Sequence, residues 1–303
     1  MKKVLLLFVF AVISSNLSAQ FYLGGNVGYS FGATPRVNGK EIKVDNEALS
    51  SSNIYGSYGE GFSGAFKFGY YFNKHIGLEL NVGYLDGAEQ IKADVLIGIE
   101  DFAINNYIAI KTDAIAYSRL FRSTLSMVYK TDLGFYGRFG FYIPIGGKTT
   151  VNTTDERIFL YPVSPEQSIP IQVSTSYKQE IHGEPTIGYA GAIGYYYGFS
   201  NGWQLFAELE YLALAIKSKD AEYISYYQEI KPYEIGNLPG FPVITTLEDL
   251  GEGKHTKFVD TIRSTDNFPE NPNFKKDEEV IEFKQSAPYD SFGINIGVVY
   301  KFN

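Results

Sequence analysis

The chain has 303 residues and no cysteine. This excludes disulfide bonds, thiolate metal sites and a cysteine nucleophile. After the first twenty residues no stretch approaches eighteen consecutive apolar residues, so no transmembrane helix is expected. Lys and Arg together number 26 against 34 Asp and Glu, a net charge of −8. Because no basic stripe offsets this balance, a nucleic-acid partner is excluded.

The first twenty residues, MKKVLLLFVFAVISSNLSAQ, have the pattern of a secretory signal peptide. Two lysines precede an apolar core over residues 4–13, and a small or polar cleavage region ends at Ala19. The apolar core is too short to span a bilayer as a helix. We expect residues 1–19 to be cleaved and the protein to be exported. Without a cysteine at the cleavage site, it is not a lipoprotein.

The rest of the chain is rich in aromatic residues and glycine, with 25 Tyr, 23 Phe and 31 Gly. Such a composition favours strands. Apolar residues recur at every second position in runs of about ten to fourteen residues, which is the period of a strand with two different faces. Eight such runs cover residues 21–31, 62–72, 76–85, 116–130, 133–145, 186–198, 203–213 and 292–303.

Short and long connections alternate between these runs. Three are turns, at residues 73–75, 131–132 and 199–202. Four are long, at residues 32–61, 86–114, 147–184 and 216–288. Eleven of the 12 prolines lie in or beside the long connections. Proline cannot donate to a strand ladder, so its distribution supports this division; Pro144 is the exception.

One face of each run carries aromatic residues near both ends and aliphatic residues between them. In the last run, Phe292 and Phe302 flank Ile296. The other face carries mainly Gly, Ser, Asn, Ala and Tyr. A hydrophobic band edged by aromatic girdles is typical of strands that face lipid. In lipid no backbone group can stay unpaired, so such strands must close on themselves.

We therefore predict an all-β fold over residues 20–303, a transmembrane antiparallel up-and-down β-barrel. We expect eight strands, short periplasmic turns and four long extracellular loops. Ten strands are the alternative if part of residues 216–288 crosses the membrane. A secreted β-sandwich is the other alternative, because its strands also alternate.

The C-terminal run resembles the assembly signal of outer-membrane proteins, with Asn295, Gly297, Tyr300 and Phe302 at the signal positions and Asn303 in addition. Residues 20–303 resemble the eight-stranded family that includes the OmpA transmembrane domain, OmpX and the Opa adhesins. The Ser-Ala-Gln cleavage context is similar to that of Bacteroidota exports. The resemblance implies a bilayer with lipopolysaccharide and the outer-membrane assembly machinery as partners. We expect no counterpart of the peptidoglycan-binding domain of OmpA.

Six charged residues fall on the inward face of the predicted barrel. An eight-stranded barrel is just wide enough for side chains to fill it. Charges removed from water cost several kcal/mol each unless they are paired, so a salt-bridged network is expected. The network acts either as a polar plug or, as the resemblance to OmpA allows, as the gate of a narrow channel. Its predicted members are Lys67, Glu79, Arg122, Arg138, Glu208 and Glu210.

No catalytic pattern is present. His75 falls in a turn, His182 lies beside Glu180 and Glu184, and His255 lies beside lysines, and none has a nucleophile at a useful spacing. The His-x-Ser arrangement of the lipid A deacylase barrels is missing. The stretch GGKTT lacks the first glycine of a phosphate-binding loop, and no helix follows it. We expect no enzyme activity, no cofactor and no metal site.

Residues 216–288 are the strongest functional indication in the sequence. They contain 14 acidic and 9 basic residues with interspersed aromatics. A connection of this length usually carries function or disorder, and aromatic residues argue against disorder. We predict an extracellular binding loop with Tyr223, Tyr226, Tyr227 and Tyr233, and a structural or surface-interaction role, for example as an accessory subunit of a larger complex. The alternative is a narrow or gated channel for ions or small solutes.

Overall fold

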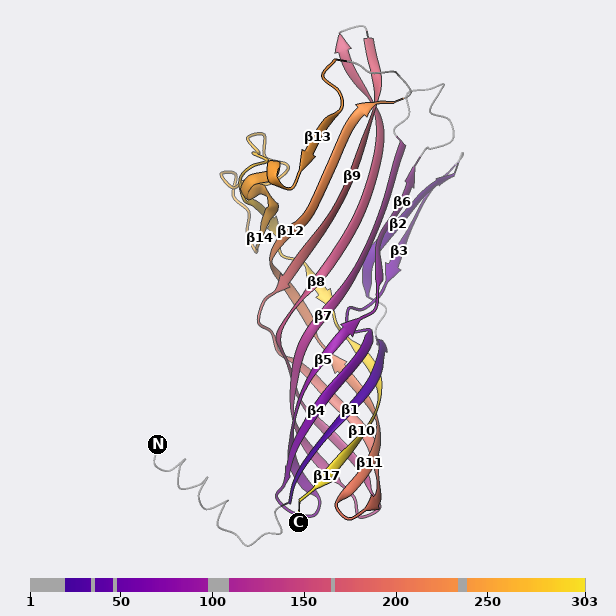
Figure 1. Ribbon diagram of the computed structural model, residues 1–303, viewed down its shortest axis with the longest axis vertical. Helices are drawn as coiled ribbons and strands as arrows, with labels where there is room; N and C mark the ends of the chain where they lie inside the picture. The colour runs from indigo at the N-terminus through magenta and orange to yellow at the C-terminus, as the bar shows by residue number, and fades with distance from the viewer. Residues whose placement is uncertain are drawn as a thin grey trace.

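The computed structural model describes residues 20–33, 36–45, 48–97, 109–164, 167–233 and 239–302. The predicted signal peptide, residues 1–19, and the final Asn303 lie outside the described residues. The fold is all-β apart from one short 3-10 segment (Figure 1). Within the described residues, no helix has the length and apolar character needed to cross a membrane.

Eight strands pair into a closed ring in which every pairing is antiparallel. The last strand pairs with the first over eleven residue pairs, from Tyr22 with Lys301 to Gly32 with Ser291. In ring order the strands are β1 (Gln20–Gly32), β4 (Gly61–Tyr71), β5 (Ile76–Gly87), β7 (Ala109–Lys130), β8 (Phe135–Ser164), β10 (Gly188–Ser200), β11 (Trp203–Ala213) and β17 (Ser291–Lys301).

Tight turns close one end of the ring, here named the turn end. They join β4 to β5, β7 to β8 and β10 to β11, at the three places predicted. Gly134 and Gly202 lie in two of them with φ of 95° and 77°. Only glycine adopts such angles without strain, which explains the residue type at both turns.

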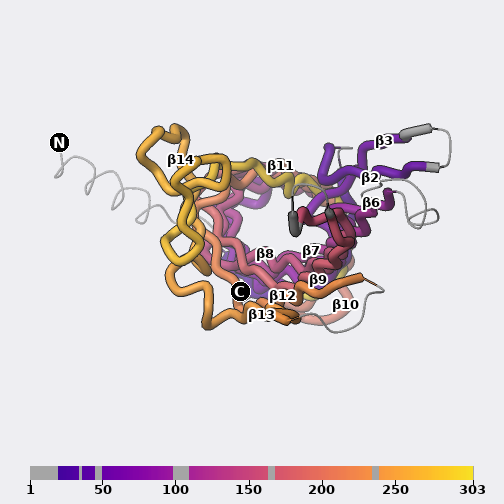
Figure 2. Tube along the Cα trace, turned by 90° about the horizontal axis from the view of Figure 1, so that it is seen from above, coloured from indigo at the N-terminus to yellow at the C-terminus, as the bar shows by residue number. Residues whose placement is uncertain are grey.

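The other end of the ring continues into a tall, curved sheet, here named the extension. Figure 1 shows it rising from the ring, and Figure 2 shows the ring from above. β7 and β8 run through both parts, and the upper half of β8 pairs with β9 (Gln167–Gly183). β9 in turn pairs with β12 (Ala215–Pro232), while β6 (Gln90–Ile97) pairs with the upper half of β7.

Smaller elements complete the extension. β2 (Val37–Asp45) and β3 (Ala48–Tyr55) form a hairpin, and β2 pairs with β6. On the other side, a lobe stands beside β12 (Figure 1). Its elements, in chain order, are β13 (Val243–Thr246), η1 (Glu248–Lys254), β14 (His255–Val259), β15 (Val280–Phe283) and β16 (Ser286–Pro288).

Strands make up most of three of the four connections predicted as loops, and in residues 216–288 five strands alternate with irregular segments, so this part of the prediction was wrong. The stretch 149–158, TTVNTTDERI, alternates like a strand but carries polar residues on both faces. A search for apolar alternation misses such a strand, because even its buried face, with Thr149, Thr153 and Asp155, is polar. The alternative with ten ring strands also fails, since β12 pairs with β9, β13, β14 and β16 rather than with a ring strand.

Pro144 lies inside β8, at a β-bulge where the pairing with β7 shifts register. Bulges are among the few places in a sheet that accept proline. The bulge falls near the level at which β8 leaves β10 and takes β9 as its partner. The exceptional proline thus marks the boundary between ring and extension.

Candidate functional site

The interior of the ring is filled in three layers. The layer nearest the turn end is apolar and aromatic. Tyr136 and Tyr196 stack with ring centroids 4.2 Å apart. The ring of Tyr22 covers Gly69 so closely that an added Cβ would lie 1.9 Å from Tyr22 Cζ. This layer consists of Tyr22, Tyr71, Val128, Tyr136, Tyr196, Phe206 and Val299.

Charged side chains form the middle layer, with Glu208 at its centre. Lys67 Nζ donates a hydrogen bond to Glu208 Oε2 at 3.0 Å, and Arg138 Nη2 donates one to Glu208 Oε1 at 2.9 Å. Only 1% of Lys67, 5% of Arg138 and 2% of Glu208 is exposed. The ion pairs thus compensate charges that have been removed from water.

Two further carboxylates belong to this charged layer. Arg138 Nη2 reaches Glu210 Oε2 at 2.5 Å. Glu79 Oε1 lies 3.5 Å from Lys67 Nζ and 3.6 Å from Arg138 Nε. The structure therefore brings five of the six predicted inward charges into contact.

Arg122, the sixth, makes no ion pair with any described residue. Its guanidinium lies 6.0 Å from the centroid of the Tyr142 ring. Arg122 and Glu210 line the same small void, of about 20 Å³. With Arg122 counted, three cations balance three carboxylates in this layer.

Neutral side chains complete the hydrogen bonds of the carboxylates, and the sequence pattern did not assign them to the network. The Tyr22 hydroxyl donates to Glu79 at 2.6 Å, and the Tyr136 hydroxyl donates to Glu208 at 2.7 Å. Asn295 Nδ2 donates to both Glu208 and Glu210 at 3.2 Å. Strand register, counted from the turns, was the signal that would have found them.

The third layer closes the ring where the extension begins. It is again apolar, and Tyr58 and Tyr289 from the connecting segments pack in it with ring centroids 5.7 Å apart. Its buried members are Tyr58, Leu85, Ala116, Leu120, Tyr142, Ala190, Leu212, Leu214, Ile216 and Tyr289. The layers together leave little free space: the void beside the charged layer, about 20 Å³, has room for one water molecule.

The four tyrosines of the predicted binding loop do not form one site. Tyr223 and Tyr226 pack with Tyr177 of β9 on the extension, at centroid distances of 5.1 and 6.5 Å. Burial raises the pKa of the Tyr223 phenol. Tyr227 lies exposed on β12, and Tyr233 follows the end of that strand, where its N–H donates to the Pro170 carbonyl.

Tyr227 has an apolar neighbour on the same face of the extension. It pairs with Thr246, and Glu229, two residues further along β12, pairs with Ile244. Residues two apart on a strand share a face, so Tyr227 and Ile244 present exposed side chains side by side. Val243 is also exposed but belongs to the opposite face.

The histidines take part in ordinary contacts. His75 Nδ1 lies 2.8 Å from the Lys130 carbonyl. His182 pairs with Asp220 at 2.9 Å and not with its sequence neighbours Glu180 and Glu184. Although burial opposes the shift, hydrogen bonds from Lys219 and His182 lower the pKa of Asp220. In the described part of the chain, no group of three or more His, Asp or Glu side chains is arranged to hold a metal ion.

Three residues of the predicted assembly signal lie on β17, in the ring, and Phe302 directly follows that strand. Asn295 points inward to the charged layer, as its hydrogen bonds require. An added Cβ at Gly297 would lie 2.6 Å from the Phe206 ring, so the glycine leaves room for that side chain. Tyr300 packs against Phe302 and against Trp203 of β11, at 5.0 Å in each case. The pattern thus has a packing role in the folded ring.

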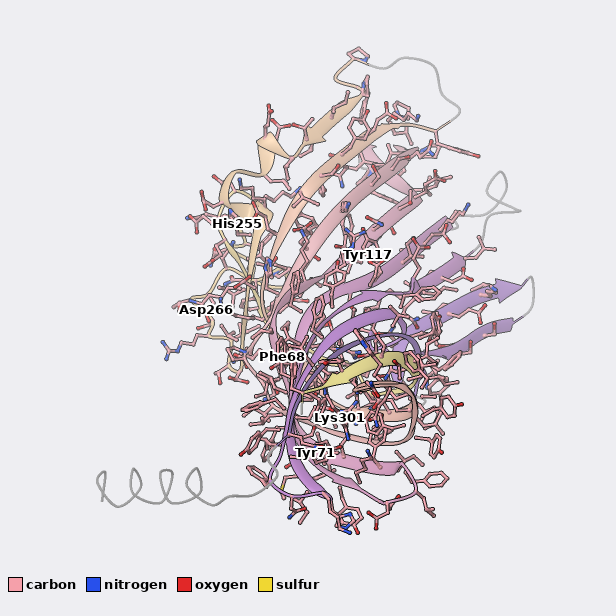
Figure 3. The ribbon with its side chains drawn as sticks, turned by 60° about the horizontal axis from the view of Figure 1, so that its bottom comes forward. Phe68, Tyr71, Tyr117, His255, Asp266 and Lys301 are labelled. Carbon is pink, nitrogen blue, oxygen red and sulfur yellow. The ribbon has the colours of Figure 1, made fainter. Side chains whose placement is uncertain are left out.

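Figure 3 shows Tyr71 and Lys301 at the turn end, and His255 and Asp266 in the lobe beside β12. Lys301 Nζ lies 5.2 Å from the centroid of the Tyr71 ring. The Lys301 side chain thus covers the apolar layer nearest the turn end.

The sequence matches no protein-family model and no curated protein. Among solved structures, the chain is similar to outer membrane protein AlkL in lipid bilayers, with 14% identity over 96% of this chain and 93% of that one, at a TM-score of 0.33. It is also similar to a major outer membrane protein of Thermus thermophilus, with 10% identity, 94% and 100% coverage and a TM-score of 0.30. A third is CarO2 of Acinetobacter baumannii, with 13% identity, 93% and 99% coverage and a TM-score of 0.30. Likeness at these scores transfers neither a location nor a substrate to this chain.

The charged layer yields a test of stability. Glu208→Ala leaves Lys67 and Arg138 buried without their shared partner, and we expect it to lower the free energy of unfolding by about 3–5 kcal/mol. Urea titration of the protein refolded in liposomes measures this change. The control is Glu156→Ala, an exposed glutamate on β8, with an expected effect within about 0.5 kcal/mol. Equal effects for the two variants would show that the ion pairs do not stabilise the ring.

Proposed function

We propose that this protein is an integral outer-membrane β-barrel whose eight ring strands span the bilayer, whose lumen is closed, and whose extension binds a partner at the cell surface. The filled interior of the ring is the single observation that carries this proposal. It leaves the extension as the part of the molecule able to act on other molecules.

The outer surface of the ring supports a membrane location. Large apolar side chains point outward along the ring strands, and Ile193 and Phe66 are 66% and 67% exposed. Such residues at mid-height of a water-exposed ring would form an apolar patch far larger than those found on soluble proteins. In a bilayer these side chains contact lipid tails, so no apolar surface is exposed to water.

Aromatic residues edge this apolar belt at both ends. Trp203, Tyr300 and Phe302 pack together at the turn end. Tyr84 contacts Phe121 near the extension, with ring centroids 4.9 Å apart. Girdles of this kind lie at the two interfaces of membrane barrels. The ring pairings of about eight to eleven residues also match the ~9–11 residues that a tilted strand needs to cross a bilayer.

The closed lumen counts against the channel alternative. Any solute would have to displace buried ion pairs in the charged layer and then pass an apolar layer on either side. We therefore assign no transport role to the ring.

The extension has the features of an interaction surface. β8 has 30 residues, about 100 Å at ~3.3 Å per residue, so roughly two thirds of it projects beyond the belt. Within the described residues, β3 pairs on one side only, with β2. Edge strands of this kind can pair with another chain. Tyr227 and Ile244 add an exposed apolar pair on the other side of the extension.

Labelling of single cysteines tests the proposed orientation, because the natural chain offers no competing thiol. We expect Thr154→Cys, on the exposed face of upper β8, to react in intact cells with a maleimide on a polymer too large for porins. Asp132→Cys, in a turn at the turn end, should react only after the cells are lysed. Gel shifts of the protein measure both reactions.

Labelling of Asp132→Cys but not Thr154→Cys in intact cells would reverse the orientation. Labelling of both in intact cells, or recovery of the protein in the culture medium, would contradict a membrane-spanning ring. Denatured protein supplies the control that each cysteine is reactive.

The partner is tested with the protein purified from native membranes in mild detergent, followed by mass measurement of the intact complex. We expect a stoichiometric partner with the natural chain and its loss with the double change Tyr227→Ser and Ile244→Ser. Val243→Ser is the matched control, because Val243 is adjacent in sequence but lies on the opposite face. A partner retained equally by both variants would exclude this face, and a lone barrel would contradict the partner role.

A further inference from the structure

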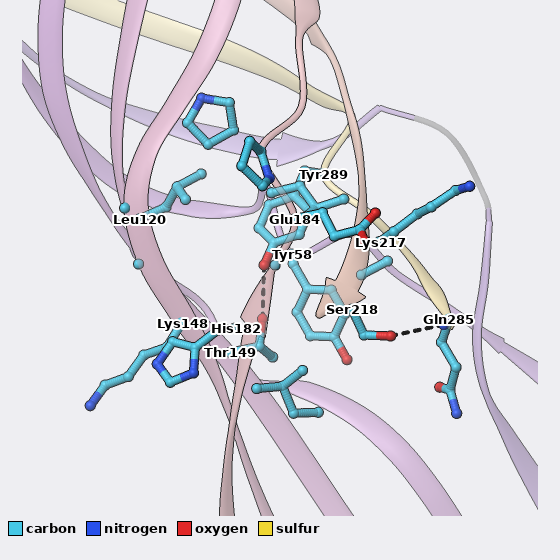
Figure 4. Close-up of a pocket in the computed structure, with 18 of the residues that line it drawn as sticks. Tyr58, Leu120, Lys148, Thr149, His182, Glu184, Lys217, Ser218, Gln285 and Tyr289 are labelled. Atoms are coloured by element: carbon cyan, nitrogen blue, oxygen red, sulfur yellow. Dashed lines mark hydrogen bonds between the residues drawn. The ribbon is translucent and has the colours of Figure 1, made fainter. Parts of the chain in front are cut away.

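A cavity of about 230 Å³ lies where β8 leaves the ring, beside the end of β9 and the start of β12 (Figure 4). Most of its walls come from four parts of the chain: the bulged segment of β8, the end of β9, the start of β12 and the segment around β16. Four single residues complete the lining: Tyr58, Lys92 of β6, Leu120 of β7 and Phe258 of β14. The third layer of the ring interior contributes Tyr58, Leu120, Ile216 and Tyr289 to the lining. The cavity thus rests on the layer that closes the ring.

The size of the cavity limits its occupant. An apolar cavity of about 150 Å³ accommodates benzene, whereas sites for drug-sized ligands measure about 300–1,000 Å³. At about 230 Å³ this cavity fits a single-ring or short-chain compound. Much of its lining is apolar, including Leu120, Ile216, Phe258 and Ala287.

The charged side chains of the lining give it a positive balance. Lys92, Lys148 and Lys217 line the cavity, against Glu184. Lys148 is paired with Glu180 at 2.7 Å, and Glu184 is paired with Lys284 at 2.7 Å. Lys92 and Lys217 make no ion pair with any described residue, which leaves two lining cations to attract an anion.

Lys92 is the more buried of these two cations. Its Nζ donates to the Asn38 carbonyl at 3.0 Å and lies 5.7 Å from the centroid of the Tyr58 ring. Burial lowers the pKa of the Lys92 ammonium. A half-buried ammonium without a carboxylate costs free energy that an anionic ligand would offset.

We propose that this cavity binds a small amphipathic carboxylic acid, with its apolar body against Leu120, Ile216 and Phe258 and its carboxylate at Lys92. Both halves of the ligand follow from the lining: an apolar wall of limited volume and an unpaired cation beside it. The site lies in the extension, so a ligand reaches it from the medium without crossing the ring. The proposal goes beyond partner binding and does not require it.

The test compares two probes with the same apolar body, 3-phenylpropanoate and 3-phenylpropanol. The full-length protein is placed in lipid nanodiscs, and binding is measured by calorimetry against empty discs. We expect saturable binding of the acid and binding of the alcohol that is weaker by about tenfold or more, because a hydrogen bond to a charged group is lost. This comparison uses the natural protein and therefore stands even if a variant fails to fold.

Variants then locate the charge. Lys92→Met should weaken binding of the acid by about tenfold or more and leave the alcohol unchanged. Lys92→Arg keeps the positive charge and should therefore retain binding of the acid. Lys231→Met is the matched control, because Lys231 is paired with Glu229 near the far end of β12.

Three results would overturn the proposal: no saturable binding of the acid above empty discs, equal affinity for acid and alcohol, or undiminished acid binding by folded Lys92→Met. None of them alters the outcome of the cysteine labelling or of the complex purification. The two proposals therefore fail independently.

Discussion

The ion pairs of Glu208 with Lys67 and Arg138 are the interaction on which the rest of the structure depends. Arg138 of β8 and Glu208 of β11 lie on the two strands that flank β10. Lys67 of β4 reaches Glu208 only when β1 pairs with β17 and closes the ring. Two buried cations would be costly without these ion pairs. Tyr136 and Asn295 then direct their donors at the same carboxylate, which ties the aromatic layer and β17 to the charged layer. Closure, interior packing and the position of the last strand are thus coupled.

Much of the ring was predictable from the sequence because each of its strands meets two different environments. Phe21 and Val27 face outward while Tyr22 and Asn26 face inward, and period-two alternation reveals this directly. Short turns fix the register of neighbouring strands, and counting residues from those turns is enough to place Lys67, Arg138 and Glu208 at equal height. The predicted contacts among these three residues are present in the structure.

The extension was not predictable in the same way. Residues 149–158 and 172–182 pair as strands although both faces are largely polar, so the apolar pattern carries no information about them. Their pairing depends on partners distant in sequence, such as β9 with β12. Arg122 shows a similar limit within the ring. Alternation correctly predicted that its side chain points inward, but packing determines that the guanidinium lies over Tyr142 and does not pair with a carboxylate. The cavity beside Lys92 likewise draws its walls from segments far apart in the sequence, among them β6, β8, β12 and β14.

The most direct measurement of the central claim, a membrane ring with a closed lumen, is single-channel conductance of the purified protein in planar lipid bilayers. The natural chain should insert without steady conductance steps. The double change Arg138→Ala and Glu208→Ala removes the centre of the charged layer but leaves the apolar layer on either side, so it should also give no steady steps. The Glu156→Ala control should remain silent. Regular unitary conductance from the natural chain would contradict a lumen closed by the three layers.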